Sequence, residues 1–250
     1  MTDVTFSVHA ELDSLSLAAA RRISALAAEA CTARGAFHIA LSGGSTPRRL
    51  YETLATAEFR DSIDWSRAHI YFGDERCVPP EHPDSNYGMA AATLLRHVPI
   101  PPQQVHRIAA AMTTVRQDAW RYAQLIATQV PRDAQGVPSF DLVLLGMGPD
   151  GHTASLFPYS CILHAHQLVA GVYVDKFHSW RISITYPLLN HARRLMFLVA
   201  GADKADMLHH IHVDPPGNNP VPIQRIAAQG VVEWLIDSAA AARLPKALTA

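Results

Sequence analysis

The chain has 250 residues, of which 49% are hydrophobic and 17% are charged, and its formal net charge is -1 at pH 7. This composition is typical of a soluble globular protein with ample material for a core. The near-neutral charge excludes a broadly basic surface for nucleic acid or an anionic membrane, so an anionic ligand must be held by a few local Lys and Arg residues.

The cysteines and histidines show no metal or disulfide pattern. Cys31, Cys77 and Cys161 are widely spaced and form no Cys-x-x-Cys motif, which argues against a disulfide framework and a thiolate zinc site. The N-terminus lacks the basic and apolar regions of a secretory signal, and no run of about 18 apolar residues occurs. We therefore expect a cytoplasmic protein. Two histidine groups are interpreted as solvated surface residues rather than as a metal site: His164 with His166, and His209, His210 with His212.

The amino-terminal part predicts a strand, a long helix and a second strand. Residues 4–9 alternate as a strand does, and residues 11–34 carry apolar side chains at helical spacing. Gly35 is placed to end this helix. Residues 37–41 form a short, apolar, β-prone run.

A glycine-rich turn, residues 42–47 (Ser-Gly-Gly-Ser-Thr-Pro), connects this strand to a further helix. We expect Thr46 to cap that helix and Pro47 to take its first position. Free backbone N–H groups and the helix dipole favour an anion at such a point. The turn is neither a Walker A loop nor a Gly-x-Gly-x-x-Gly motif. Although an ordinary capped turn is the alternative, we favour a phosphate site.

Charged residues follow the next strand, residues 68–72, in the sequence Gly-Asp-Glu-Arg at 73–76. Three charges at the carboxyl end of a strand are costly to place there unless they face a cleft. A solvated loop between a strand and a helix is the alternative interpretation of this stretch.

The most informative stretch is the turn after the buried strand 140–145, which contains three glycines. Asp150 and His152 lie on this turn, and in an open α/β sheet the turn after a strand's carboxyl end is where ligands bind. Thr153 and Ser155 are expected to cap a following helix. On this stretch alone, a glycine-rich turn with a surface histidine is an equally supported alternative.

The remaining segments continue the alternation of strands and helices, so the sequence predicts one α/β domain over residues 1–250 with a largely parallel sheet and right-handed crossovers. The expected helices are one capped by Ser85 and ending before Pro99, one over 114–130 with Trp120 and Tyr122 in the core, one running towards His212, and an alanine-rich one from Asp237. The expected strands are 168–174, 181–185, 195–200 and 231–236, with a short turn or helix at 187–190 and loops at 175–180 and 214–220.

Three polar turns therefore follow strand ends, at residues 42–46, 74–76 and 150–152. In a parallel sheet the three can lie at one edge, and Arg181 and Lys204 from later elements can reach it. One candidate base, several acids, a phosphate cradle and a few cations suggest a small phosphorylated substrate, with no nucleotide and no metal.

Several blocks of the sequence carry a family resemblance, in order over nearly the whole chain. They are residues 41–47 with 50–51; residues 64–65, 72–79, 82 and 85–87; residues 145–158, the most specific block; and residues 181–185, 189–190, 201–205 and 234–237. These blocks resemble the 6-phosphogluconolactonases. The chain departs from that pattern between Tyr159 and Trp180, a stretch that includes Lys176.

The resemblance implies a Rossmann-like α/β fold shared with glucosamine-6-phosphate deaminases. It also implies hydrolysis of 6-phospho-D-glucono-1,5-lactone to 6-phosphogluconate, the second step of the oxidative pentose phosphate pathway, without a cofactor. We expect a monomer, with a dimer as the alternative, and no nucleic-acid or membrane partner.

Lactone hydrolysis needs a base for water, and we assign that role to His152, whose unperturbed pKa of about 6.5 suits it. Asp150 is expected to orient the His152 ring, with a purely structural role in the turn as the alternative. Asp74 either contacts sugar hydroxyls or holds Arg76. Positive charge for the phosphate is expected from Arg76, Arg181 and Lys204. The full set of expected substrate-binding residues is Ser42, Gly43, Gly44, Ser45, Thr46, Asp74, Arg76, Gly148, Arg181 and Lys204.

Two other functions compete with the hydrolase. A glucosamine-6-phosphate deaminase pattern carries Asn-Glu just after the histidine turn, whereas residues 156–158 here are Leu-Phe-Pro, so an acid is missing. A non-catalytic sugar-phosphate sensor would normally carry a DNA-binding region, and no helix-turn-helix extension or basic segment is present.

Overall fold

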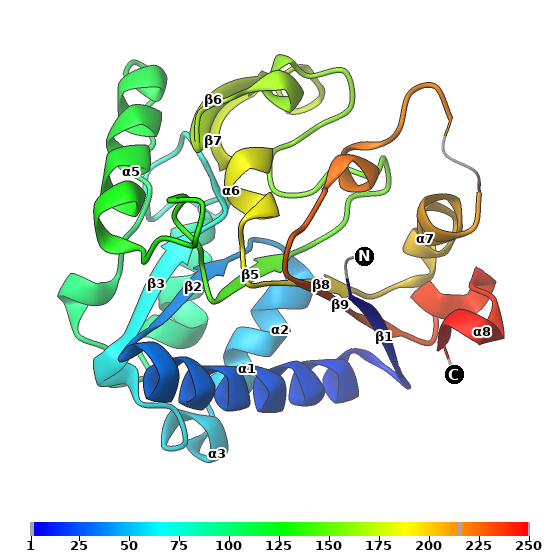
Figure 1. The fold of residues 1–250 in the computed structure, drawn as a ribbon, viewed down its shortest axis with the longest axis horizontal. Helices are drawn as coiled ribbons and strands as arrows, with labels where there is room; N and C mark the ends of the chain where they lie inside the picture. Colours follow the sequence, from blue (N-terminus) through cyan, green and yellow to red (C-terminus); the bar gives the residue numbers. More distant parts are fainter. Residues whose placement is uncertain (1–2, 215–216, 250) are drawn as a thin grey trace.

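The computed structural model of the chain describes residues 3–214 and 217–249. At its centre is a parallel sheet with the strand order β1-β9-β8-β5-β2-β3 (Figure 1). Every residue of β2 and β5 is buried, which fits strands that are covered on both faces. The strands are β1 (Val4–His9), β2 (Phe37–Leu41), β3 (Ala68–Phe72), β5 (Leu142–Leu145), β8 (Arg194–Val199) and β9 (Val231–Asp237).

Helices cover both faces of this sheet, as the sequence predicts. In Figure 1, α1, α2 and α3 lie below the sheet, and α5, α6 and α7 lie above it or at its sides. Gly35 ends α1 with φ 83°, as expected. None of the helices in the described residues is long and apolar enough to span a bilayer. The helices are α1 (Leu12–Arg34), α2 (Ser45–Leu54), α3 (Ala57–Arg60), α4 (Asn86–Ala90), α5 (Val115–Gln129), α6 (Tyr186–Asn190), α7 (Ala205–His212) and α8 (Lys246–Thr249).

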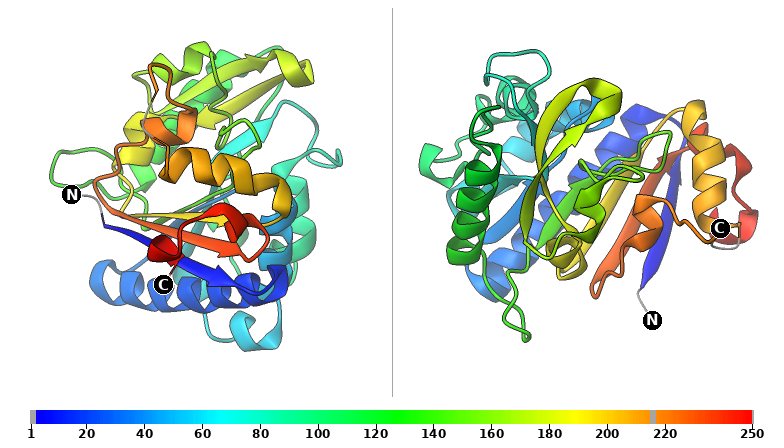
Figure 2. Two further views of the ribbon diagram at one scale, coloured as in Figure 1. Left: turned by 90° about the vertical axis from the view of Figure 1, so that its right-hand side faces the viewer. Right: turned by 90° about the horizontal axis from the view of Figure 1, so that it is seen from above.

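A second, antiparallel sheet breaks the alternation that the sequence suggests. It has the order β4-β7-β6, with β4 (Asp74–Arg76), β6 (Val169–Val174) and β7 (Ser179–Ile184). The turn between β6 and β7 is too short for a parallel crossover, so the two strands form a hairpin. Figure 2 shows this hairpin crossing above the main sheet. The charged stretch after β3 is therefore a strand paired with β7, and not a solvated loop.

Other expected features differ from the structure in instructive ways. Helix α2 begins at Ser45, with Gly44 as its N-cap, so Thr46 is not the cap. Trp120 is 62% exposed, because the buried stripe of α5 runs through other positions, including Tyr122. Asp237 ends β9, and only the short helical turn Ala240–Arg243 follows it in place of a long helix. The carboxylate of Asp237 accepts hydrogen bonds from the backbone amides of Gly201 and Ala240.

The cap of α4 is as expected, because the hydroxyl of Ser85 accepts a hydrogen bond from the backbone of Gly88 at 3.0 Å. After α4, one wider helical turn, Ala91–Leu95, continues the helix towards Pro99. Two residues of the expected loop at 214–220, Pro215 and Pro216, lie outside the described residues.

Candidate active site

A cleft opens where β2, β3, β5 and β8 end, at one edge of the main sheet. The chain leaves β2 towards β3 on one side, while β5 lies on the other, and such a reversal of strand order creates a crevice in open α/β sheets. All of the residues expected from the sequence line the cleft except Asp150, which lies behind His152: Ser42, Gly43, Gly44, Ser45, Thr46, Asp74, Arg76, Gly148, His152, Arg181 and Lys204.

The turn between β2 and α2 needs its two glycines for different reasons. A Cβ atom on Gly43 would lie 1.9 Å from Oδ1 of Asn86, so a side chain there would displace the buried Asn86. Gly44 has φ 109°, in the region that favours glycine. The hydroxyl of Tyr51 accepts a hydrogen bond from the Ser42 amide (3.0 Å) and donates one to the Ser42 carbonyl (2.7 Å). This fixed turn presents the N-terminus of α2 to the cleft, a position that favours an anion.

The turn after β5 brings Asp150 and His152 together. Nδ1 of His152 donates a hydrogen bond to Oδ1 of Asp150 at 2.5 Å. The backbone of Gly148 donates to the His152 carbonyl at 2.9 Å, and a Cβ atom on Gly148 would lie 2.0 Å from two atoms of the His152 ring. Nε2 of His152 has no hydrogen-bond partner among the described residues, so one ring nitrogen is held and the other is open.

The environment sets the charge of this pair. Burial lowers the pKa of His152, and this effect exceeds the opposite effect of the Asp150 carboxylate. Burial raises the pKa of Asp150, but the His152 hydrogen bond and the Lys176 charge outweigh it, so the net pKa lies below the ordinary value. The ring of His152 also stacks on Phe157 at 4.1 Å between centroids. At neutral pH the pair is therefore a neutral imidazole beside an ionised carboxylate.

The two hydroxyl residues after this turn do not cap a helix, contrary to expectation. Thr153 donates to the Gly146 carbonyl at 2.8 Å, and Ser155 donates to Oδ2 of Asp74 at 2.6 Å. The next helical turn begins only at Cys161. The hydroxyls therefore fix the floor of the cleft, because hydroxyl groups that bond across the fold are not available to a helix start.

Asp74 is held from two sides. Besides the bond from Ser155, its Oδ1 accepts a hydrogen bond from Nδ2 of Asn86 at 3.0 Å. Asp74 forms no ion pair with Arg76 within the described part of the chain, so of its two expected roles the contact with Arg76 is not seen. Neither Ser155 nor Asn86 was expected to contact Asp74. Both lie in the resembling blocks, but their residue types alone give no sign of this contact across the fold.

The cations are distributed over two walls of the cleft. Arg181 is 7% exposed, and within the described residues its guanidinium makes no hydrogen bond or ion pair. Instead it lies between aromatic rings, 5.4 Å from the Phe157 centroid and 4.8 Å from that of Phe177. Arg76 is its direct cross-strand neighbour. Such like charges repel, so this wall favours a bound anion.

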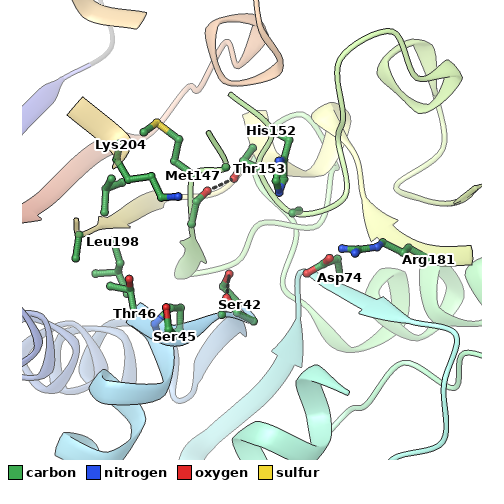
Figure 3. Close-up of a pocket in the computed structure, with 18 of the residues that line it drawn as sticks. Ser42, Ser45, Thr46, Asp74, Met147, His152, Thr153, Arg181, Leu198 and Lys204 are labelled. Carbon is green, nitrogen blue, oxygen red and sulfur yellow. Dashed lines mark hydrogen bonds between the residues drawn. The ribbon is translucent and has the colours of Figure 1, made fainter. Parts of the chain in front are cut away.

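Lys204 lies on the opposite side. Figure 3 shows its side chain on the side of Ser45 and Thr46, whereas Arg181 lies beside Asp74. Its Nζ also lies 2.7 Å from Asp203. From the sequence we expected Lys204, Arg76 and Arg181 to bind the phosphate together. In the structure Lys204 lies across the cleft from the two arginines. Within the described residues, no group of three or more His, Cys, Asp or Glu side chains is arranged to hold a metal ion.

Comparison with known proteins adds an independent line of evidence. The sequence matches the family described as glucosamine-6-phosphate isomerases/6-phosphogluconolactonase over residues 10–234. A 6-phosphogluconolactonase of Synechocystis sp. is 41% identical over 216 residues, covering 86% of this chain and 88% of that protein. The structure is similar to that of a 6-phosphogluconolactonase from Trypanosoma brucei, with a TM-score of 0.85, 30% identity, and coverage of 98% of this chain and 100% of that one. A monomeric glucosamine-6-phosphate deaminase shares the fold, with a TM-score of 0.78 at 19% identity, over 97% of this chain and 100% of that one.

Proposed function

The chain belongs to the family of glucosamine-6-phosphate isomerases and 6-phosphogluconolactonases, and from this premise we propose that it hydrolyses 6-phospho-D-glucono-1,5-lactone to 6-phospho-D-gluconate. The observation that carries the proposal is the Asp150–His152 pair, which opens on a cleft lined by cations. The enzyme needs no cofactor in this proposal. It acts as a monomer in the cytoplasm, in the second step of the oxidative pentose phosphate pathway.

In the proposed reaction, Nε2 of His152 takes a proton from water while the water oxygen adds to the lactone carbonyl carbon. The tetrahedral intermediate then breaks the bond to the ring oxygen, which takes the proton from His152 and becomes a hydroxyl. Asp150 holds the Nδ1 proton and stabilises the imidazolium that forms between these steps. The lowered pKa of His152 keeps the base form available at neutral pH.

The phosphate of the substrate is proposed to bind the backbone of the turn at Gly43–Ser45 and the ammonium of Lys204. A helix N-terminus and a lysine together suit a dianion. Arg76 and Arg181 supply further positive charge from the opposite wall, where the unpartnered guanidinium of Arg181 is ready to take an anion.

The residues next to the base favour the hydrolase over the deaminase that shares the fold. Moving a proton between sugar carbons requires a further acid–base group beyond one histidine. In this chain the ring of Phe157 stacks on His152 where such an acid would follow the turn. The carboxylate of Asp74 already accepts hydrogen bonds from Asn86 and Ser155.

The proposal is tested by measuring proton release when the purified protein meets freshly generated 6-phosphogluconolactone, against the spontaneous rate. We expect rapid acceleration of lactone hydrolysis and no release of ammonia from glucosamine 6-phosphate. Lactone hydrolysis at the spontaneous rate would contradict the proposed function.

A further inference from the structure

The β6–β7 hairpin reaches from the second sheet to the active-site pair. Its turn is Asp175–Phe177, followed by His178 with φ 46°. Lys176, at the tip, places its Nζ 3.3 Å from Oδ2 of Asp150. Lys176 and Asp150 are 26 residues apart in the chain, and the tip of the hairpin lies in the stretch where the sequence departs from the family pattern.

The two oxygens of Asp150 therefore have different partners. Oδ1 accepts hydrogen bonds from Nδ1 of His152 at 2.5 Å and from its backbone amide at 3.3 Å. Oδ2 faces the ammonium of Lys176. A carboxylate that is held at both oxygens cannot rotate freely, so Lys176 fixes the plane in which Asp150 meets the imidazole.

The neighbouring residue of the tip, Phe177, contacts the other side of the site. Its ring lies 4.8 Å from the Arg181 guanidinium and meets Phe157 edge-on at 5.8 Å. Phe157 in turn stacks on His152. Because Phe177 remains 46% exposed, burial in the core does not explain its position, whereas a ring beside a desolvated guanidinium is stabilising.

We infer that the tip of the β6–β7 hairpin positions the active site, with Lys176 fixing Asp150 and Phe177 holding the guanidinium of Arg181 towards the cleft. This inference rests on the proposed function. Both are positioning residues, since each acts on a site residue and neither needs to touch the substrate.

The two contacts predict separable effects. The charged groups that face His152 are Asp150 and Asp74, which raise its pKa, and Arg181, which lowers it. Lys176 acts through Asp150. Without the ammonium of Lys176, the negative charge of Asp150 is no longer partly neutralised, and the pKa of His152 shifts upwards. Phe177 carries no charge, so its loss acts on the site only through a looser Arg181, whose contact with a bound anion weakens.

Kinetic measurements on Lys176→Met, Lys176→Arg and Phe177→Ala test this division, with Arg96→Met as a control that removes an exposed cation elsewhere. For Lys176→Met we expect kcat to fall about fivefold, the size expected for a half-exposed ion pair, with KM unchanged. The acid limb of its pH–rate profile moves to higher pH, and Lys176→Arg restores both values. For Phe177→Ala we expect a higher KM, with kcat closer to the wild-type value than in Lys176→Met.

Each outcome bears on one contact. Unchanged kcat and an unchanged acid limb in Lys176→Met would overturn the role of Lys176, and an unchanged KM in Phe177→Ala would overturn that of Phe177. Thermal melting of each variant separates these effects from loss of fold.

An NMR titration of the His152 ring needs no substrate, and its signal is identified by its loss in His152→Gln. If the wild-type protein leaves the lactone untouched, the proposed function fails. The titration still decides whether Lys176 acts on the pair: an upward shift in Lys176→Met supports the contact, and no shift overturns it.

Discussion

Two His–Asp pairs in this molecule have almost the same hydrogen-bond geometry and opposite surroundings. His152 meets Asp150 at 2.5 Å, and His191 meets Asp133 at 2.6 Å, with all four side chains less than one-third exposed. The first pair follows the carboxyl end of β5. The second lies at the other edge of the sheet, before β5 and β8 begin.

The difference lies in what the second ring nitrogen meets. Nε2 of His152 opens on a cleft with cations and a helix N-terminus. Nε2 of His191 lies 3.3 Å from the side-chain amide of Gln229. A histidine bonded to an aspartate is thus not by itself a catalytic site. The open nitrogen and the charged walls around it are what support the role proposed for His152.

The largest effect is expected when the two histidines are removed in turn. His152→Ala should lower kcat/KM for the lactone by about 10²–10⁴-fold, as the loss of a general base does. His191→Ala should keep the wild-type rate, because that pair lies at the edge of the sheet away from the cleft. Steady-state proton release by both variants checks this, and comparable activities in the two variants would break the distinction between the pairs.

A second comparison replaces a glycine beside each pair. Gly148→Ala places a Cβ atom 2.0 Å from the His152 ring, so the ring must move, and displacement by about 1 Å can cost about 100-fold in rate. Gly136, next to Asp133, has a positive φ but no atom within 4 Å of its Cβ position. Gly136→Ala should therefore lower the stability of the fold, because of the positive φ, and leave kcat unchanged. Activity and melting temperature are measured for both, and full activity of Gly148→Ala would show that the ring position is not critical.

The sequence locates the two turns that line the cleft because the features that define them are local. The β2–α2 turn and the Asp150–His152 turn each lie within a few residues after a buried strand, so periodicity and glycine content are enough to locate them. The pair at Asp133 and His191 joins residues 58 positions apart, and no local pattern indicates it.

Long-range contacts account for what sequence reasoning missed around the cleft. The pairing of β4 with β7 depends on two strands more than 100 residues apart, and it decides that Asp74 is buried. The bonds from Ser155 to Asp74 and from Lys176 to Asp150 also cross between elements. A hydroxyl residue after a turn suggests a helix cap unless its partner on another strand is known.

The cations of the cleft give the next smaller effect. Lys204→Ala should raise KM by about 10- to 100-fold, since one hydrogen bond to a charged phosphate contributes about 1.5–3 kcal/mol, while kcat changes little. Arg132, near the second pair, bonds to the Gly136 carbonyl, and Arg132→Ala should leave KM unchanged. An unaltered KM in Lys204→Ala would mean that the phosphate binds elsewhere.

The smallest effect on activity is expected from three further histidines near the amino ends of β2 and β3. His38 and His69 stack at 4.7 Å, and His69 stacks on His106 at 5.5 Å. Burial lowers the pKa of His38 and of His106 to about 4. In the unfolded chain these rings titrate near 6.5, so the unfolded state binds more protons between these values. The stack therefore stabilises the fold fully above pH 6.5 and loses that contribution as the pH falls towards 4.

Melting temperatures from pH 7 to pH 4 measure this loss of stability. The variant His106→Gln distinguishes the contribution of the histidine stack from that of the carboxylates, which titrate in the same pH range. The variant should lose less stability on acidification than the wild type, because one of the protonation steps is gone. Its lactone hydrolysis at pH 7 should equal that of the wild type, since the stack lies at the edge opposite the cleft. Parallel plots of melting temperature against pH for the two proteins would show that folding does not lower the pKa of His106. A loss of activity at pH 7 would show that the two edges are coupled.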